Sequence, residues 1–314
     1  MANTLNARPN WPELMDPSFR TIYNETTNGF PSVLGQIFNI QSSSKAYEKD
    51  TSVTGSGKMV RKPEGDTISY SSPIGGYPVT YNHLTFGDGE IVTYEMYQDD
   101  EYNIIKKAPA RLAEHKSLTK EQYAADIFNY AFTVGGGGTA TFTAGDAVAL
   151  CSASHPRKDG GAAQSNYTTA DLDEDSLEAA LVAMRATKDN KGELVMYRPD
   201  TLLVPPALEK EARILLESQL RTGTGNNDIN PYKGKLNLLV WDFLGSAAGG
   251  SDTAWFLIDS KKNDLNWFDR DDRGLEGPEY DFDTKSAKWS VVARWSAGFS
   301  DWRGVYGSLG TNAS

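Results

Sequence analysis

The chain has 314 residues, of which 39% are hydrophobic and 23% charged, as in an ordinary folded protein rather than an intrinsically disordered one. Its formal net charge of −11 argues against duplex DNA reading as the main function, because proteins that grip phosphates need a basic face. The single cysteine, Cys151, excludes an intrachain disulfide and any cysteine-based zinc or iron–sulfur site built from one chain.

No stretch approaches the roughly 18 apolar residues of a membrane span. The N-terminal sequence has no basic start followed by an apolar core, so it does not predict a signal peptide. We therefore expect no membrane contact, and synthesis and folding in a reducing cytoplasm.

Residues 1–45 predict an N-terminal arm with at most short helical pieces, because four prolines and many Asn and Thr accompany scattered large apolar side chains. Trp11, Phe19 and Phe38 would be poorly placed in a free tail exposed to water. Two interpretations stay open. The arm lies on another part of an assembly, or it packs on its own domain.

Residues 47–98 are expected to be rich in β-strand, because three segments alternate polar with apolar residues between turn signals of glycine and proline. The three segments are 67–72, 79–86 and 90–97. The part over 50–80 has few large aliphatic residues, so a hairpin there cannot bury a core of its own and must lean on something else. Its basic residues include Lys58, Arg61 and Lys62.

Residues 101–132 predict a helix, because apolar side chains recur near the 3.6-residue period. Pro109 predicts a kink or a restart in this helix. Thr119 with Gln122 fits a capping box for the second part. Four consecutive glycines, 135–138, end the predicted helix.

The segment 140–240 predicts an α/β unit after a small, polar start. One helix is expected from Asp175, and a second is begun by Pro205 and Pro206, since proline suits the first helical turn. The apolar stripes of the two helices are Leu177, Ala180, Leu181 and Met184, and Leu208, Ala212, Leu215 and Leu216. Strands are expected at 201–204 and 235–243, with a loop rich in Gly and Asn over 221–232.

The C-terminal part is aromatic, since six of the seven tryptophans lie from Trp241 onward. Trp255–Ile258 is wholly apolar, as in a buried strand, whereas 289–295 alternates with a period of two. Extended segments near both ends, helices between them and no repeat at a fixed period predict the α+β class.

Cys151 and His155 lie four residues apart, but a nucleophilic pair needs its base within hydrogen-bond reach and an orienting third group. Such pairs do not usually arise from neighbours in sequence, so a small packed thiol and a turn histidine are the favoured interpretation. A hydrolase that uses this pair is the alternative.

Two other patterns fall short of a ligand site. Gly55–Met59 suggests a phosphate loop but lacks the first glycine and the closing Ser or Thr of that motif. Asp269, Asp271 and Asp272 hint at a calcium loop, but no Glu occupies the closing position, which favours a solvated acidic turn. We expect no catalytic residue, cofactor or metal ion, and this favours a structural role.

Several packing and turn motifs occur between residues 145 and 304. The most specific is Arg198–Pro199 followed by Leu202–Glu209. The others are Leu150–Pro156, Gly160–Gly161, Gln164–Asn166, Ser176–Ala180, Ala183–Arg185, Asn230–Tyr232, Ala254–Asp259 and Asp301–Gly304. Together these segments resemble the Mu-type major head subunit family of tailed bacteriophages.

This resemblance implies the HK97-like major capsid protein fold. Its parts would be an N-terminal arm (1–45), an extended β-hairpin loop (46–89), a peripheral domain with a spine helix (90–139), an axial domain (140–240) and a return to peripheral strands (241–314). The function implied is a shell subunit that assembles as hexamers and pentamers around a double-stranded DNA genome. An encapsulin-like nanocompartment, which shares the fold but houses a cargo enzyme, is the alternative.

In such a shell, basic residues of the loop would meet acidic residues of a neighbour. The expected inter-subunit contacts are Trp11, Phe19, Phe38, Lys58, Arg61, Lys62, Asp269, Asp271 and Asp272. The loop expected near the capsomer axis contains Gly223, Gly225, Asn226 and Asn227. A portal is implied and, because the arm begins almost at Met1, a separate scaffolding protein, with decoration proteins left open. DNA is expected to make only weak non-specific contact, inside a virion capsid assembled in the bacterial host cytoplasm.

Overall fold

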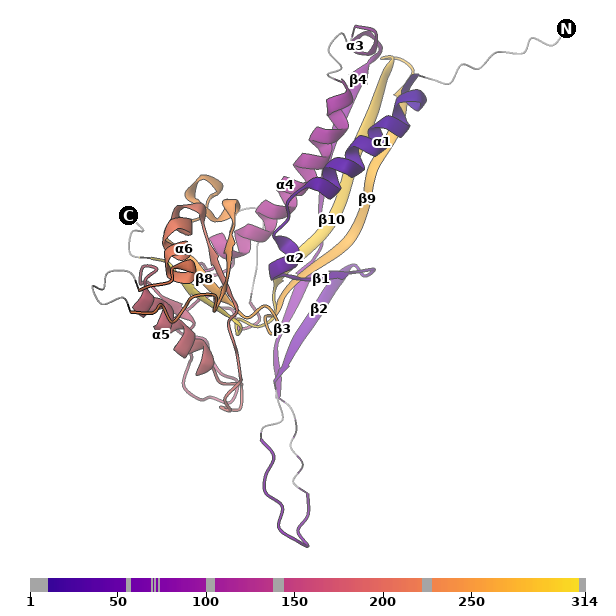
Figure 1. Ribbon diagram of the computed structural model, residues 1–314. Coiled ribbons are helices and arrows are strands. Elements are labelled where there is room, and N and C mark those ends of the chain that lie inside the picture. The colour runs from indigo at the N-terminus through magenta and orange to yellow at the C-terminus, as the bar shows by residue number, and fades with distance from the viewer. Residues whose placement is uncertain are drawn as a thin grey trace, which may run out of the picture.

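A long helix, two sheets and a projecting loop organise the computed structural model of the chain (Figure 1). The structure describes residues 11–54, 58–68, 70, 72, 74–99, 105–137, 144–221 and 228–310. Its helices and strands fall largely in separate segments, which confirms the predicted α+β class. None of the helices formed by these residues combines the length and the apolar character of a membrane-spanning segment.

The first sheet has four strands in the order β1-β9-β10-β4 and runs along the elongated half of the molecule (Figure 1). The strands are β1 (Asn39–Ser42), β9 (Leu265–Asp281), β10 (Ser286–Phe299) and β4 (Leu84–Thr93). The alternation predicted over 289–295 is confirmed, because every second side chain is buried against helices. Those side chains are Trp289, Val291, Ala293 and Trp295.

Helix α4 (Ala108–Asn129) lies along this sheet and is the main part of the helix predicted over 101–132. Of the predicted kink or restart, the structure shows the restart, because α4 begins at Ala108 and Pro109 occupies its first turn, where its missing N–H has no helical partner to lose. The predicted capping box is wrong. Thr119 lies within the continuous helix, and its Oγ1 donates to the carbonyl of His115 at 2.6 Å. A short turn, η1 (Ile105–Lys107), precedes α4.

The N-terminal segment contains a long helix, α1 (Trp11–Gly29), followed by the short α2 (Leu34–Ile37). Helix α1 packs against α4 and β9 (Figure 1), and this contact buries Phe19 and Tyr23. The burial outweighs the cost of Pro17 inside the helix. The expectation of at most short helical pieces is therefore wrong for this segment.

A two-stranded hairpin, β2 (Tyr47–Thr54) with β3 (Ile74–Asn82), carries the projecting loop (Figure 1). The described residues of the strand predicted over 67–72 are not in a strand. After the hairpin the chain enters β4 and pairs with β10. The extended loop predicted over 46–89 therefore ends where β4 begins.

Two predicted strands are divided by local structure. The strand predicted over 79–86 is interrupted at His83, between the end of β3 and the start of β4. The strand predicted over 90–97 ends at Thr93, because the Thr93 hydroxyl accepts the N–H of Met96 and caps helix α3 (Tyr94–Gln98).

The second sheet has five strands in the order β5-β11-β8-β6-β7. They are β5 (Tyr167–Thr168), β11 (Val305–Ser308), β8 (Trp255–Ile258), β6 (Thr201–Val204) and β7 (Asn237–Val240). Helices α5 (Glu174–Arg185) and α6 (Glu209–Glu217) pack on one face, and we call this sheet with its two helices the lobe. All residues of β6 and β8 are buried, which confirms both predicted buried strands.

Both helices predicted in this part are confirmed. In α5 the four residues of the predicted stripe are the buried ones. The helix begins slightly earlier than expected, because Asp173 and Ser176 form a reciprocal capping box with bonds of 2.6 and 3.0 Å. Pro206 begins a short turn, η2 (Pro206–Leu208), that leads into α6. Two more short turns, η3 (Asp242–Leu244) and η4 (Ser246–Ala248), follow β7.

The strands of 241–314 do not all return to the four-stranded sheet. Only β9 and β10 do so, whereas β8 pairs with β6 and β11 in the lobe. The wholly apolar sequence of β8 is the physical reason, because such a strand needs cover on both faces. The expected boundary between axial and peripheral parts is corrected accordingly.

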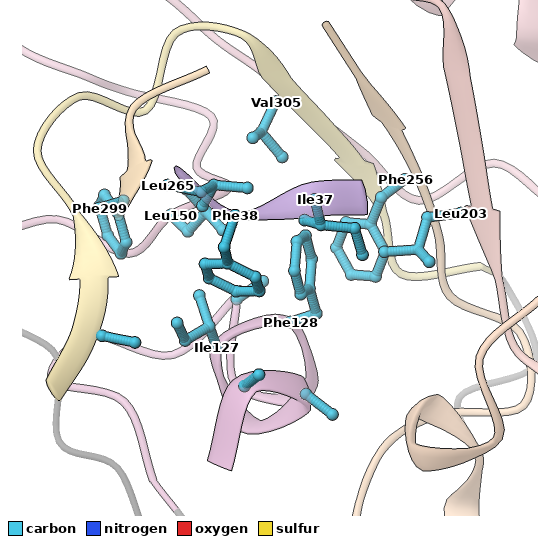
Figure 2. Close-up of a cluster of buried hydrophobic side chains, with 14 of the residues drawn as sticks. Ile37, Phe38, Ile127, Phe128, Leu150, Leu203, Phe256, Leu265, Phe299 and Val305 are labelled. Atoms are coloured by element: carbon cyan, nitrogen blue, oxygen red, sulfur yellow. The ribbon is translucent and has the colours of Figure 1, made fainter. Parts of the chain in front are cut away.

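One buried cluster joins the two sheets (Figure 2). The ring of Phe128 from α4 lies 5.2 Å from that of Phe256 in β8 and 6.2 Å from that of Phe38. Leu203 of β6 and Leu265 of β9 belong to the same cluster. The elongated half and the lobe therefore share a core, with α4 between them.

Candidate functional site

The loop between β2 and β3 projects from the body of the molecule (Figure 1). It exposes apolar side chains that its own chain leaves uncovered. Val60 is 71% exposed and Tyr70 is 92% exposed, and Met59 and Ile68 are exposed as well. Removing apolar surface from water is favourable by roughly 25 cal/mol per Å². The loop is therefore a candidate surface for association.

The base of this loop is held against the lobe by lysine contacts. Lys158 Nζ donates to the carbonyl oxygen of Gly76 at 2.5 Å and lies 4.7 Å from the ring centroid of Tyr77. Lys191 Nζ donates to the carbonyl oxygen of Ser72, also at 2.5 Å. These contacts set the direction in which the loop leaves the body.

Of the three basic loop residues, Lys58 is paired within its own chain. Its Nζ lies 2.7 Å from a carboxylate oxygen of Glu193 in the lobe. The hydrogen bond and the charge of Glu193 raise the pKa of Lys58. This pairing corrects the expectation that Lys58 meets a neighbour's acids. Arg61 and Lys62 are exposed and form no ion pair with the residues that the structure describes.

The acidic patch expected to meet a neighbour's loop is neutralised within the chain. Asp269 Oδ1 and Asp272 Oδ2 each lie 3.1 Å from Lys120 Nζ of α4, and Asp272 also contacts a second lysine of α4. Burial disfavours the Asp272 carboxylate, but the two lysines outweigh that effect and lower its pKa. Asp271 pairs with Arg273 at 2.9 Å. These contacts correct the expected pairing, because the chain already supplies the counter-charges.

Phe19 and Phe38 are not available to a neighbouring subunit, because both lie in the chain's own core. This burial corrects the expectation for these two side chains and favours the alternative in which the arm packs on its own domain. The side chain of Trp11 lies outside the described residues. The loop expected near the capsomer axis, with Gly223, Gly225, Asn226 and Asn227, also lies outside them.

Cys151 and His155 are both buried structural residues. Burial raises the pKa of the Cys151 thiol, which disfavours the nucleophilic thiolate. The two ring nitrogens of His155 lie 2.8 Å from Asp146 Oδ2 and 3.0 Å from Asn166 Oδ1, and the ring stacks on Trp302 at 4.2 Å. His155 is thus a buried core residue with both nitrogens hydrogen-bonded, and the hydrolase alternative loses its base.

Metal binding was likewise not expected. Among the described residues, no group of three or more His, Cys, Asp or Glu side chains is arranged to hold a metal ion. The Asp269–Asp272 segment lies in strand β9 rather than in a turn, so the interpretation as a solvated acidic turn is wrong. Its carboxylates pair with cations of the chain instead.

The face of the four-stranded sheet opposite the helices is only partly covered, and we call it the outer face. Because Trp295 faces the helices, its neighbour Arg294 points to the outer face. The hairpin covers one end of this face, where the rings of Tyr81 and Phe268 lie 5.0 Å apart. Ile91 of β4 is 57% exposed on the uncovered part.

The sequence patterns did not single out the two arginines on this face. Arg270 and Arg294 form no ion pair with the residues that the structure describes, and the Nε atom of each is buried without a hydrogen-bond partner. The alternation over 289–295 was the available signal, since it places Arg294 opposite the tryptophans. Nothing local in the sequence marks Arg270, which lies at an irregularity between β9 and β10.

The comparison with protein families decides what kind of protein this is. The model of a family described as phage capsid protein matches residues 76–308, which include α4, the lobe and strands β4, β9 and β10 of the four-stranded sheet. The chain belongs to the phage capsid protein family. No curated protein matches the chain.

Solved structures with a similar fold come from phages and from a GTA particle. The Mycobacterium phage Patience structure has a TM-score of 0.53 at 12% identity, covering 96% of this chain and 88% of that chain. The capsid of bacteriophage JBD30 decorated with minor capsid protein trimers has a TM-score of 0.54 at 12% identity, covering 69% and 92%. The capsid of the native GTA particle has a TM-score of 0.54 at 12% identity, covering 88% and 90%.

Identities this low show the fold alone, and they confirm the HK97-like α+β fold. Membership of this family makes the chain a phage capsid protein, a structural protein of the virion and not an enzyme. The encapsulin-like alternative is not favoured, because the matching family and structures are phage capsids.

Proposed function

We propose that this capsid protein assembles as hexamers and pentamers into an icosahedral shell that encloses double-stranded DNA. A closed shell needs the same contacts repeated on every subunit. The projecting loop carries the proposal, because its exposed Val60 and Tyr70 have no cover in their own chain. A loop lying across a neighbour would bury them and enlarge each contact beyond the roughly 800 Å² per partner of a standard interface.

Arg61 and Lys62 belong to the same proposal. Their charges are not neutralised by the described residues of their own chain, so they are free to meet carboxylates on a neighbouring subunit. Phe19 and Phe38 of the N-terminal arm do not bridge to a neighbour, because both are buried in their own chain. Helix α1 and Phe38 stabilise their own subunit, so a deletion of 2–40 would unfold the protein instead of testing a contact.

Electron microscopy of the purified protein tests the proposal, and closed shells are expected. Replacing residues 58–68 by a Gly/Ser linker of equal length should leave a folded subunit but abolish shells, because the linker lacks the apolar side chains. Val182→Ser is the matched control, since it removes an apolar side chain of α5 that is 60% exposed but lies outside the loop. Normal shells from the linker variant would contradict the role of the loop. Absence of shells from the unaltered protein would contradict the whole proposal.

Within the family, we assign the chain to the Mu-type major head subunits. Two of the segments that resemble that group are adjacent in space, since His155 stacks on Trp302. This packing supports one core assembled from both segments, Leu150–Pro156 and Asp301–Gly304. Agreement of these contacts with those in an experimental structure of a Mu-type head subunit would test the assignment.

We also propose a portal, a separate scaffolding protein and decoration proteins as partners, and assembly in the bacterial host cytoplasm. The JBD30 capsid carries minor capsid protein trimers on a subunit of the same fold, which supports decoration here. The net charge of −11 supports weak, non-specific contact with packaged DNA. Mass spectrometry of intact virions should detect the portal and decoration proteins, and precursor shells should contain the scaffold.

A further inference from the structure

Three nitrogen-bearing side chains gather where the hairpin meets the outer face. His83 lies between β3 and β4, Arg270 lies on β9 and Arg294 lies on β10. Burial is the main cause of the lowered pKa of His83, and the positive charges of Arg294 and Arg270 lower it further. The strand geometry places both arginines near the imidazole, because His83 contacts Ser296, two positions after Arg294 on β10, and Arg270 adjoins Asp271, the strand partner of Arg294. We call these three residues the cationic site.

Each member of the cationic site has a buried nitrogen with no hydrogen-bond partner among the described residues. These atoms are His83 Nε2, Arg270 Nε and Arg294 Nε. His83 is only 9% exposed, and its Nδ1 lies 3.0 Å from Ser296 Oγ. Arg270 has one long contact, from Nη1 to the carbonyl oxygen of Ser43 at 3.5 Å. A buried donor left without an acceptor costs free energy, so the site is incomplete in the isolated subunit.

The acids closest to the cationic site are already engaged. Glu48 influences His83, but its carboxylate accepts from Lys45 at 2.8 Å and from a serine hydroxyl at 2.7 Å. Asp271 is the strand partner of Arg294 in the sheet, but its carboxylate pairs with Arg273. Neither of these two carboxylates is therefore left to pair with the cationic site.

Uncommitted carboxylates occur at the tip of the projecting loop. A turn closed by the N–H of Asp66 and the carbonyl of Pro63, 3.3 Å apart, presents Glu64 and Asp66 to solvent. Gly65 adopts a φ of +84° in this turn, which suits glycine. Neither acid forms an ion pair with the described residues of its own chain. Figure 1 shows the described part of the loop pointing away from the four-stranded sheet.

We propose that the cationic site of one subunit receives the carboxylates of Glu64 and Asp66 from the loop of a second copy of this chain. The proposal rests on the shell function proposed above and names the surface that the loop contacts. The surfaces also match in their apolar parts, since Ile91 is exposed on the outer face and Ile68 is exposed near the acids. A nucleic-acid phosphate is the less favoured ligand of the cationic site, because the chain carries a net charge of −11.

The signs of the charges are opposite to the pairing expected from the sequence. The acids of β9 are neutralised by α4 and by Arg273, so cations are what remain unpaired on this sheet. Opposite charges across an interface select the partner and its register. The unpaired cations of the partly covered outer face therefore make the contact between subunits more specific for its partner than apolar side chains alone would.

Zero-length carbodiimide cross-linking of assembled shells tests the contact directly. The reagent joins a carboxylate to a primary amine but not to a guanidinium, so Arg294→Lys and Arg270→Lys place reactive amines in the site and keep its charge. We expect covalent subunit ladders, and peptides that link position 294 or 270 to Glu64 or Asp66. Arg213→Lys, on α6 of the lobe, is the control and should give no such peptide.

Charge reversal gives an independent test. At a fixed subunit concentration, Arg294→Glu and Glu64→Lys should each lower the yield of closed shells by about tenfold, because like charges then face each other. The two changes combined in one chain should recover most of the yield, since every contact again joins opposite charges. Lys62→Glu combined with Arg294→Glu is the matched control and should not recover it. Circular dichroism verifies that each variant is folded.

The outcomes separate this proposal from the shell function. Normal shell yield from Arg294→Glu, or cross-links that join Glu64 only to other positions, would overturn the docking and leave the shell function intact. A defect of Arg294→Glu that appears only when DNA is present, without a peptide cross-link, would indicate a phosphate guest and also overturn it. Failure of the unaltered chain to form shells would overturn both proposals.

Discussion

The two larger sheets of this protein differ in what covers them. The five-stranded sheet has α5 and α6 on one face and the core around α4 on the other, so β6 and β8 are buried throughout. The four-stranded sheet has α1 and α4 on one face, while its outer face leaves Ile91 and Arg294 partly open. A sheet covered on both faces stabilises the subunit alone. A sheet with an open face and unpaired cations is completed by another molecule.

The junction between the two sheets gives the largest expected effect. Asp301 follows β10, Arg303 precedes β11, and they form a buried ion pair with Nη1 and Oδ2 2.8 Å apart. Arg303 also donates to the carbonyl oxygen of Lys188 and to the side chain of Asn190. Asp301→Asn should lower the free energy of unfolding by about 3–5 kcal/mol, because it leaves a buried guanidinium without its counter-charge. Urea denaturation followed by circular dichroism measures the loss.

An exposed ion pair provides the comparison for this variant. Glu209 and Arg213 pair at 2.8 Å on the surface of α6, where solvent screens the interaction. Glu209→Gln should leave the denaturation midpoint nearly unchanged. If Asp301→Asn also left the denaturation midpoint unchanged, the ion pair could not be what stabilises the junction of the two sheets.

Matched aliphatic truncations test the comparison of the two sheets. Leu203 of β6 is fully buried, whereas Ile91 of β4 is more than half exposed on the outer face. Leu203→Ala should destabilise the subunit by about 2–5 kcal/mol, through lost burial and the cavity left behind. Ile91→Ala should cost less than about 1 kcal/mol in the subunit, because little surface is re-exposed. Equal losses in urea denaturation would mean that both sheets are covered alike.

The fully covered sheet was the easier one to predict from the sequence. Thr201–Val204 and Trp255–Ile258 have continuous apolar sequences, which is the pattern of strands buried on both faces. The apolar face of α5 was equally easy to predict, because its four apolar residues follow the helical period. In these segments local pattern and tertiary environment agree.

The N-terminal helix could not be predicted with the same ease. Its prolines and polar residues favour irregular structure, and Pro17 lies inside the helix. The spacing of Met15, Phe19 and Tyr23 fits one helical face, but the helix is stabilised by packing of that face on α4 and β9. Burial against the rest of the fold makes this segment helical, and the helix propensities of its residues do not predict that burial.

The pairing of charged residues at the candidate site could not be predicted from the sequence either. Composition located acids on one segment and bases on the loop, but it could not pair them. Asp269 and Asp272 bind Lys120, which is 149 and 152 residues away in the chain. Contacts across such separations leave no periodic signal, so the free charges of the outer face emerge only from the three-dimensional arrangement.

Two glycines, one in each sheet, differ in how much space surrounds them. A Cβ at Gly307 of β11 would lie 2.6 Å from Cys151 Sγ and 3.0 Å from the Phe256 ring, whereas one at Gly87 of β4 would meet Val292 at an ordinary 3.6 Å. Gly307→Ala should destabilise the subunit by about 1–3 kcal/mol through overpacking. Gly87→Ala should be neutral or stabilise it by about 0.5 kcal/mol, because alanine loses less backbone entropy on folding.

Thermal unfolding of the two glycine variants, each compared with the unaltered chain, measures the difference. Gly307→Ala with Cys151→Ala should regain part of the lost stability, since the sulfur is the closest obstacle. A stable Gly307→Ala variant would show that the five-stranded sheet has room that the structure does not show.

The smallest expected effect depends on pH and lies again between the sheets. Asp264 directly precedes β9, and burial raises its pKa from 3.8 to about 6, with further increases from the charges of Asp301 and Asp50 and an opposing effect of Arg303. The folded state therefore holds this proton more tightly than the unfolded chain does. The stability that this proton contributes is complete below about pH 4 and is lost as the pH rises to about 6.

Asp264→Asn imitates the protonated carboxyl group and removes this loss. Above pH 7 the variant should be more stable than the unaltered chain by about 1–2 kcal/mol, a value reduced for partial screening by solvent, and near pH 4 the two should be equal. Urea denaturation at several pH values measures the difference. A gain of the same size at pH 4 and pH 7.5 would assign it to packing rather than charge, and the carboxylates at the junction of the two sheets would then not repel one another enough to oppose folding.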